Sequence, residues 1–155
     1  MDLLLTPYNI GNCRIENRVV MTAASLCRAQ EGCVSRELLR FYEERARGGV
    51  GLIIAGGAGI VPEQSNPKEL QIWNDRFCPG LRKLTETIHK YKSRIFLQLL
   101  HPGAYVFPAQ SETLPPMAPS SYQSGLTRQT THAMNEADIS RTIRQFAAAA
   151  ERAKR

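Results

Sequence analysis

Residues 42–55 read Y-E-E-R-A-R-G-G-V-G-L-I-I-A and hold the end of a helical pattern that is followed at once by an apolar run. The Gly48-Gly49 pair predicts the end of the helix, because glycine readily adopts the backbone conformation that closes a helical segment. Residues 50–55 are almost continuously apolar, which is typical of a strand buried on both faces. A helix that leads directly into such a strand indicates an α/β protein built around a parallel sheet.

The same alternation continues on both sides of this stretch. Residues 18–21 and 94–100 are short and mainly apolar, and they predict two further strands. Side chains able to cap a helix precede the first two helical segments, Ser35 and then Asn74 or Asp75, and a third helix is expected from about Asn135. Strand and helix therefore alternate three times, and right-handed crossovers between parallel strands are expected.

Each predicted helix has one apolar face, with apolar residues at spacings of three and four. These residues are Leu38, Leu39, Tyr42 and Ala46 in the first helix, Phe77, Leu81, Leu84, Ile88 and Tyr91 in the second, and Ile139, Ile143, Phe146, Ala147 and Ala150 in the third.

Two segments fall outside the alternation. A turn at residues 10–13 predicts a small hairpin before the first strand, which would close the bottom of a barrel. Residues 102–132 are rich in Pro, Ser, Thr and Gln and follow the carboxyl end of the third predicted strand, so we interpret them as an active-site loop. Residues 1–155 contain no internal repeat and no linker, which favours a single domain.

Composition excludes several functional classes. The net charge of +6 comes from scattered basic residues without an aromatic-interleaved stripe, so no nucleic-acid partner is expected. The four cysteines form no CxxC pair and have no histidine at zinc-finger spacing, which argues against a metal site and favours reduced thiols in the cytoplasm. No apolar stretch approaches the about 18 residues of a membrane span, so no membrane association is expected.

Small residues follow each predicted strand, in segments 22–25, 55–59 and 98–103. They would let a planar ring lie close to the backbone, and Gln98 offers both a donor and an acceptor. The glycine-rich segment 55–59 matches neither GxGxxG nor GxxxxGK[ST]. Its glycines could equally serve tight turns, and the pattern alone leaves both interpretations open.

Four segments, taken in order, resemble the old yellow enzyme family of NADH:flavin oxidoreductases. They are the TP…IGN…NRVVM sequence of residues 6–21, YEERARGGVGLII of 42–54, IFLQLLHPG of 95–103 and APS of 118–120. The resemblance implies the N-terminal part of an FMN-binding (β/α)8 barrel, about three βα units long. Such barrels take about 250 residues, so strands four to eight are expected to be absent from residues 1–155.

The resemblance also implies the cofactor contacts. Ala23, Ala24 and Ser25 would contact FMN after the first strand, Gly57 would pass under the flavin, and Gln98 would bond the pyrimidine edge of its ring. Ser25 stands where the family carries Thr or Cys near flavin O4 and N5, and Cys27 could take that place in another register. The family's catalytic positions lie on later strands, so no catalytic residue is predicted here.

Some residues depart from the family pattern. Ala23 replaces the usual proline of the first turn, Gly56 replaces a glutamate, and Ala104 replaces an arginine. These differences concern loop geometry and substrate contacts more than flavin contacts made by the backbone. His101 could contact a substrate or bond to the neighbouring backbone, and the sequence leaves both possibilities open.

Two functions follow from the resemblance. One is an FMN-dependent oxidoreductase of the ene-reductase or dienoyl-CoA reductase type, which uses NADH or NADPH to reduce an unsaturated carbonyl or enoyl substrate. The alternative is a truncated, non-catalytic half barrel that acts at most as an assembly partner. Open strand edges predict self-association or pairing with a complementary half barrel.

Overall fold

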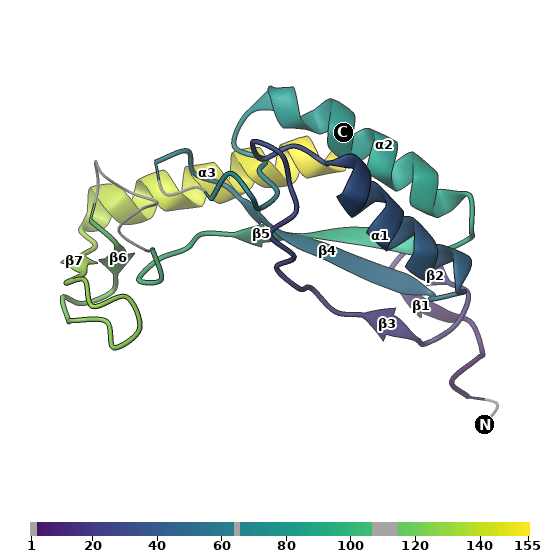
Figure 1. Ribbon diagram of the computed structural model, residues 1–155. Coiled ribbons are helices and arrows are strands. Elements are labelled where there is room, and N and C mark those ends of the chain that lie inside the picture. The colour runs from purple at the N-terminus through teal and green to yellow at the C-terminus, as the bar shows by residue number, and fades with distance from the viewer. Residues whose placement is uncertain (1–2, 64–65, 107–114) are drawn as a thin grey trace.

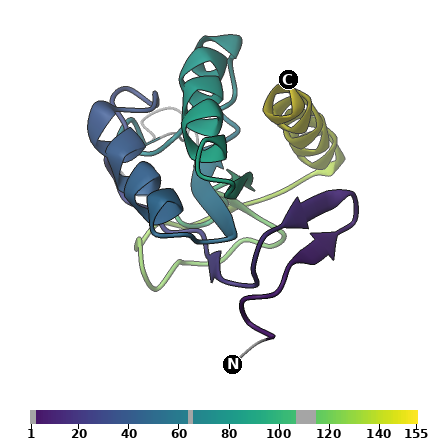
Figure 2. The ribbon, with the colours of Figure 1, turned by 90° about the vertical axis from the view of Figure 1, so that its right-hand side faces the viewer.

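A three-stranded parallel sheet is the centre of the computed structural model, which describes residues 3–63, 66–106 and 115–155. Its order is β3–β4–β5, with bounds Val20–Met21, Leu52–Gly59 and Arg94–Leu100. Helices α1 (Arg36–Arg47) and α2 (Cys78–His89) lie together on one face of this sheet (Figures 1 and 2). The parallel α/β arrangement expected from the sequence is confirmed.

Local capping explains where α1 begins and ends. The Ser35 hydroxyl accepts a hydrogen bond from the Leu38 amide at 3.0 Å and donates one to the Arg28 carbonyl. Gly48 closes the helix, and its amide donates to the Glu44 carbonyl at 3.0 Å. Both ends therefore agree with the sequence-based prediction.

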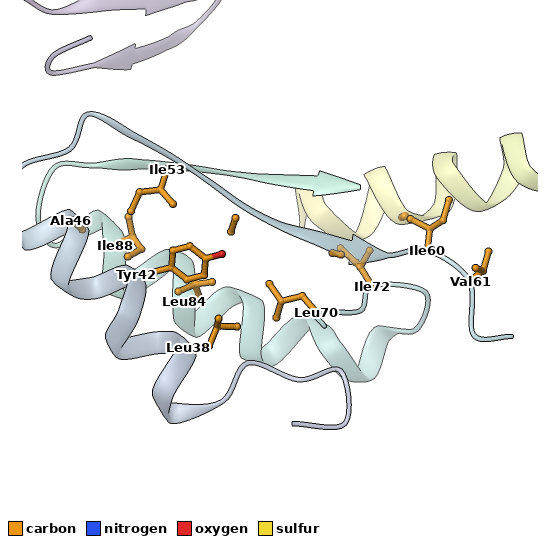
Figure 3. Close-up of a cluster of buried hydrophobic side chains, with 13 residues drawn as sticks. Leu38, Tyr42, Ala46, Ile53, Ile60, Val61, Leu70, Ile72, Leu84 and Ile88 are labelled. Carbon is orange, nitrogen blue, oxygen red and sulfur yellow. The ribbon is translucent and has the colours of Figure 1, made fainter. Parts of the chain in front are cut away.

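The hydrophobic core fills the space between the two helices and the sheet (Figure 3). Tyr42, Ile53 and Ile88 are at most 1% exposed, and Leu84 lies beside them. Complete burial of one such aliphatic side chain stabilises the fold by about 1.5–3 kcal/mol. The core of the described residues therefore lies on the sheet face that α1 and α2 cover.

Strand boundaries differ from the predictions in two places. β3 contains only Val20 and Met21, whereas β4 continues past Ala55 through the glycine-rich segment to Gly59. The β4–β5 register shifts between Ala55 and Ala58, so the segment is a bulged strand end and not a separate loop. A Cβ atom added at Gly57 would lie 2.8 Å from Leu100 Cβ, which explains why glycine is needed there.

The hairpin predicted before the first strand is present. β1 (Tyr8–Ile10) and β2 (Cys13–Ile15) pair in antiparallel fashion. The Arg94 Nε at the start of β5 donates to the Arg14 carbonyl at 3.1 Å, which ties the hairpin to the amino end of the sheet.

The second helix has an extra turn at its start. Asn74 caps a 3-10 helix, Asp75–Phe77, and α2 follows it directly. The segment interpreted as a loop also contains two short parallel strands, β6 (Met117–Ala118) and β7 (His132–Ala133), so this part of the loop prediction was wrong.

Helix α3 (Glu136–Lys154) leaves most of its apolar face uncovered. It starts where the sequence indicated, and Asn135 and Asp138 form a capping box there. Ile139 and Ile143 are 47% and 63% exposed, and Ala149 is the buried apolar residue of the helix. Figure 2 shows α3 beside the α1–α2 layer, and Arg152 Nε near the end of α3 lies 2.7 Å from Asp75 Oδ1 at the start of the 3-10 turn before α2. Within the described ranges, no helix is long and apolar enough to cross a membrane.

Gly51→Ala tests the tight entry into β4. An added Cβ would lie 2.2 Å from the Asn17 carbonyl oxygen, so we expect a loss of about 1–3 kcal/mol in the free energy of unfolding. Gly125→Ala is the control, because nothing lies within 4 Å of its added Cβ, and its change should stay within about 0.5 kcal/mol. Urea unfolding followed by circular dichroism measures both; equal midpoints for the two variants would contradict the packing described here.

Candidate functional site

The carboxyl ends of β3, β4 and β5 meet at one edge of the sheet, because the three strands are parallel. Ligands of parallel α/β proteins bind at this edge, where the connecting loops converge. The sequence-predicted site residues all belong to it: Ala23, Ala24 and Ser25 follow β3, Gly57 lies in β4, and Gln98 lies in β5.

The segment after β3 presents unused backbone donors. The amide groups of Ala23, Ala24 and Ser25 donate no hydrogen bond to another described residue. Ala24 and Ser25 are exposed. Free N–H groups at an accessible strand end can be satisfied by an acceptor on a ligand.

The Ser25 side chain has a partner that the sequence did not suggest. Its hydroxyl is hydrogen-bonded to the carboxylate of Glu69, which stands in an irregular segment far along the chain. Nothing in the pattern of residues 60–72 marked Glu69, since only folding brings the two segments together. The exposed Cys27 Sγ lies 3.6 Å from Ser25 Oγ. The two residues that could make the same cofactor contact are therefore neighbours, and the choice between them stays open.

The glycines at the end of β4 lie beside Ser25 and Glu69. Gly56 and Gly57 are buried, and with Ser25 and Glu69 they line a cavity of about 10 Å³, room for about one water molecule. The Gly56 amide donates to the Tyr42 hydroxyl at 3.4 Å from the core side. Burial raises the pKa of Tyr42, so this phenol stays protonated at neutral pH.

Gln98 projects on the other side of β5 from the core. Its neighbours Leu97 and Leu99 pack against the core cluster, and alternation along the strand places Gln98 on the sheet face that α1 and α2 do not cover. The side chain is exposed and makes no hydrogen bond to the described residues. A Cβ added at Gly56 would lie 3.0 Å from the Gln98 carbonyl oxygen, so the two strands approach closely here.

His101 makes the backbone contact that was one of its two expected roles. Its Nδ1 accepts a hydrogen bond from the Gly103 amide at 3.1 Å, while its buried Nε2 has no partner among the described residues. Burial, followed by the charge of Arg141, lowers the pKa of His101, and Glu63 opposes this effect. The imidazole is therefore neutral at pH 7, and contact with a substrate stays a prediction.

A second polar cluster ties the long segment after β5 to α3. The Asp138 carboxylate accepts hydrogen bonds from the Asn135 amide at 3.1 Å, from His132 Nε2 at 3.0 Å and from Arg141 at 2.7 Å. Arg141 also lies 3.6 Å from Met117 Sδ, so β6 and β7 are both held against the start of α3. Across the part of the chain that the structure describes, no group of three or more His, Cys, Asp or Glu side chains is arranged to hold a metal ion.

Comparison with known protein families bears on this edge of the sheet. Residues 3–155 match the model of the NADH:flavin oxidoreductase / NADH oxidase family. The chain belongs to this family. Its members in solved structures include an old yellow enzyme homologue from Zymomonas mobilis, with a TM-score of 0.87 and 26% identity over 97% of this chain and 44% of that one.

Curated relatives extend well beyond this chain. A metal reductase of Desulforamulus reducens is 38% identical over 99% of this chain and 23% of its own length. An NADPH dehydrogenase of Geobacillus sp. strain WCH70 is 33% identical over 98% of this chain and 44% of its own length. The chain thus spans less than half of either relative.

These similarities confirm three sequence-based expectations. The family is that of the old yellow enzymes, the fold is a partial (β/α)8 barrel of three parallel strands, and the chemistry of the family is that of flavin and nicotinamide. The individual roles assigned to Ala23, Ala24, Ser25, Gly57 and Gln98 stay predictions.

Asp138→Asn tests the cluster at the start of α3. The hydrogen bond from the Asn135 amide, followed by those from His132 and Arg141, lowers the pKa of Asp138. A lowered pKa means that the ionised carboxylate stabilises the folded state above its ordinary pKa and that this stabilisation is lost as pH falls through the folded value.

We therefore expect Asp138→Asn to lower the free energy of unfolding at neutral pH and to flatten the decline of that free energy as pH falls below the ordinary carboxyl range. Urea titrations at several pH values measure this dependence. Glu136→Gln, which removes an exposed carboxylate from the same helical turn, is the matched control for the loss of one charge. Identical pH profiles for wild type and Asp138→Asn would refute the assignment.

Proposed function

We propose that this chain forms the flavin-contacting floor of an FMN-dependent NAD(P)H oxidoreductase. The proposal is carried by hydrogen-bonding groups at one edge of the sheet that have no partner among the described residues. The amides of Ala23, Ala24 and Ser25 and the side-chain amide of Gln98 lack partners among the described residues, and all belong to strand ends where this family's barrels would take a ligand.

The residues present fit the chemistry of an isoalloxazine ring. The ring has acceptors at N1, O2, O4 and N5 and a donor at N3, and hydrogen bonds to these atoms tune its redox behaviour. Backbone N–H groups suit the acceptors, while Gln98 can serve a donor and an acceptor together. We keep Gly57, at the end of β4, as a proposed backbone contact of the ring.

FMN, when bound, supplies hydride transfer from NADH or NADPH to a substrate. The chain's own residues would orient the ring; no catalytic residue is assigned to them. We propose an unsaturated carbonyl or enoyl substrate, which is supported by the 31% identity to a multifunctional alkene reductase/demethylase of Caballeronia cordobensis. The four free cysteines support a cytoplasmic location.

A second candidate function is assembly with complementary βα units. Apolar side chains remain exposed on the uncovered sheet face and on α3: Val20, Phe96, Ile139, Ile143 and Phe146. β3 and β5 also each have one edge without a partner strand among the described residues. Open edges and apolar faces favour association, because pairing removes both from water. A second copy or a complementary half barrel would supply that cover.

Gln98→Ala tests the flavin contact. Loss of a hydrogen bond worth about 0.5–1.5 kcal/mol should raise the Kd for FMN by about 2- to 12-fold. Quenching of FMN fluorescence on titration with the chain measures this. Asn9→Ala removes an exposed amide from the hairpin at the opposite end of the sheet and should leave the Kd unchanged. Absence of FMN binding by the wild-type chain would reject the proposal.

Ile143→Glu tests assembly through α3. If the exposed apolar row is an interface, a buried charge should weaken self-association by at least about 10-fold. Light scattering coupled to size-exclusion chromatography measures the mass across a concentration series. Leu126→Glu, also 63% exposed but outside α3, is the matched control. A wild-type chain that stays monomeric at all concentrations would exclude self-association.

A further inference from the structure

The Ser25–Glu69 pair determines which way the serine hydroxyl can bond. An ionised carboxylate only accepts hydrogen bonds, so Ser25 is the donor and its single proton points to Glu69. The serine oxygen then has only lone pairs to offer another partner. The Cys27 thiol, a weak donor 3.6 Å away, can use a lone pair but cannot redirect the proton.

Glu69 is held in place by the backbone around it. Its amide donates to the Asn66 carbonyl at 3.0 Å, and its carbonyl accepts from Gln71 Nε2 at 3.3 Å. The flanking residues are tied to other elements, since Lys68 accepts from the Ala29 amide at 2.8 Å and Leu70 accepts from the Gly59 amide at 2.8 Å. The carboxylate therefore reaches Ser25 from an anchored segment.

The charge of Glu69 is not offset by an ion pair within the described ranges. Its side chain is half-buried and lines the same small cavity as Ser25 and Gly57. Its interaction with Ser25 is thus the specific contact that the structure gives this carboxylate.

Flavin N5 changes its hydrogen-bonding character on reduction: oxidised N5 accepts, whereas reduced N5 carries a proton and donates. A serine oxygen that offers only lone pairs would repel oxidised N5 and accept from reduced N5–H. We propose that Glu69 is a positioning residue that, through Ser25, makes this site favour reduced over oxidised flavin. The inference rests on the proposed function and on the family resemblance, which puts Ser25 near flavin O4 and N5.

The test compares the Kd of the full chain for oxidised FMN with that for reduced FMN under anaerobic conditions. Glu69→Ala frees the serine proton to donate to oxidised flavin, so the preference for reduced FMN should fall by about 3- to 10-fold. Glu69→Gln keeps an amide oxygen that can accept the proton, so its preference for reduced FMN should not fall below that of wild type. Ser25→Ala should lose the preference, and adding Glu69→Ala to it should change nothing further.

Charge alone predicts the opposite sign, because removing a negative charge eases electron addition to the flavin. Glu63→Ala removes such a charge from the same segment without touching Ser25, and measures that effect separately. A rise in the preference for reduced FMN in Glu69→Ala, or an equal effect of Glu69→Ala with and without Ser25, overturns the inference.

The apo chain distinguishes failure of this inference from failure of the flavin site. Three-bond NMR couplings should report one Ser25 side-chain rotamer in wild type and Glu69→Gln, and averaged rotamers in Glu69→Ala. Averaging in wild type overturns the inference even if FMN binds. A single rotamer in a chain that binds neither form of FMN rejects the flavin site and, with it, this role of Glu69.

Discussion

The parallel pairing of β4 with β5 is the constraint on which the other features depend. Six residue pairs, from Leu52–Arg94 to Gly59–Leu100, align the two strands, and the shift between Ala55 and Ala58 lets the glycines approach β5. This pairing brings Gly56 and Gly57 to the same edge as Gln98. It also presents one continuous face for α1 and α2 to cover. A side chain at Gly57 would meet Leu100 before the strands reached this distance.

The two faces of the sheet differ in how far they are covered. Ile53 and Ala55 point to the helices and are fully buried, whereas Phe96 on the opposite face is 38% exposed. In a closed barrel, that second face becomes the interior, filled by side chains from all the strands. The exposed apolar side chains of α3 have the same explanation. In a closed barrel, each helix packs against the strands that flank it. Three parallel strands cover only part of such a structure.

The segment between β4 and α2 links the fold to the site. Backbone hydrogen bonds join Gly32 to Pro67 and to Gln71, and Ile72 to Gly59, so this irregular stretch is fastened both to the loop before α1 and to the end of β4. Gln71 is buried beneath it, and any side chain at Gly32 or Gly59 would collide with it. This packing carries Glu69 to Ser25, and it converts a segment without regular structure into part of the candidate cofactor corner.

Local patterns in the sequence determined most of the elements and the family. Ser35 and the Gly48-Gly49 pair marked the ends of α1, because caps act through bonds to the nearest turn of backbone. The β5 boundaries, Arg94 to Leu100, followed from apolar patterning, and the ordered motifs identified the barrel. Only the tertiary structure decided that Gly56 to Gly59 extend β4, that two short strands lie in the segment after β5, and that Ile143 is exposed. It alone paired Ser25 with Glu69, because contacts between distant segments depend on how strands and loops pack, which no local pattern of residues records.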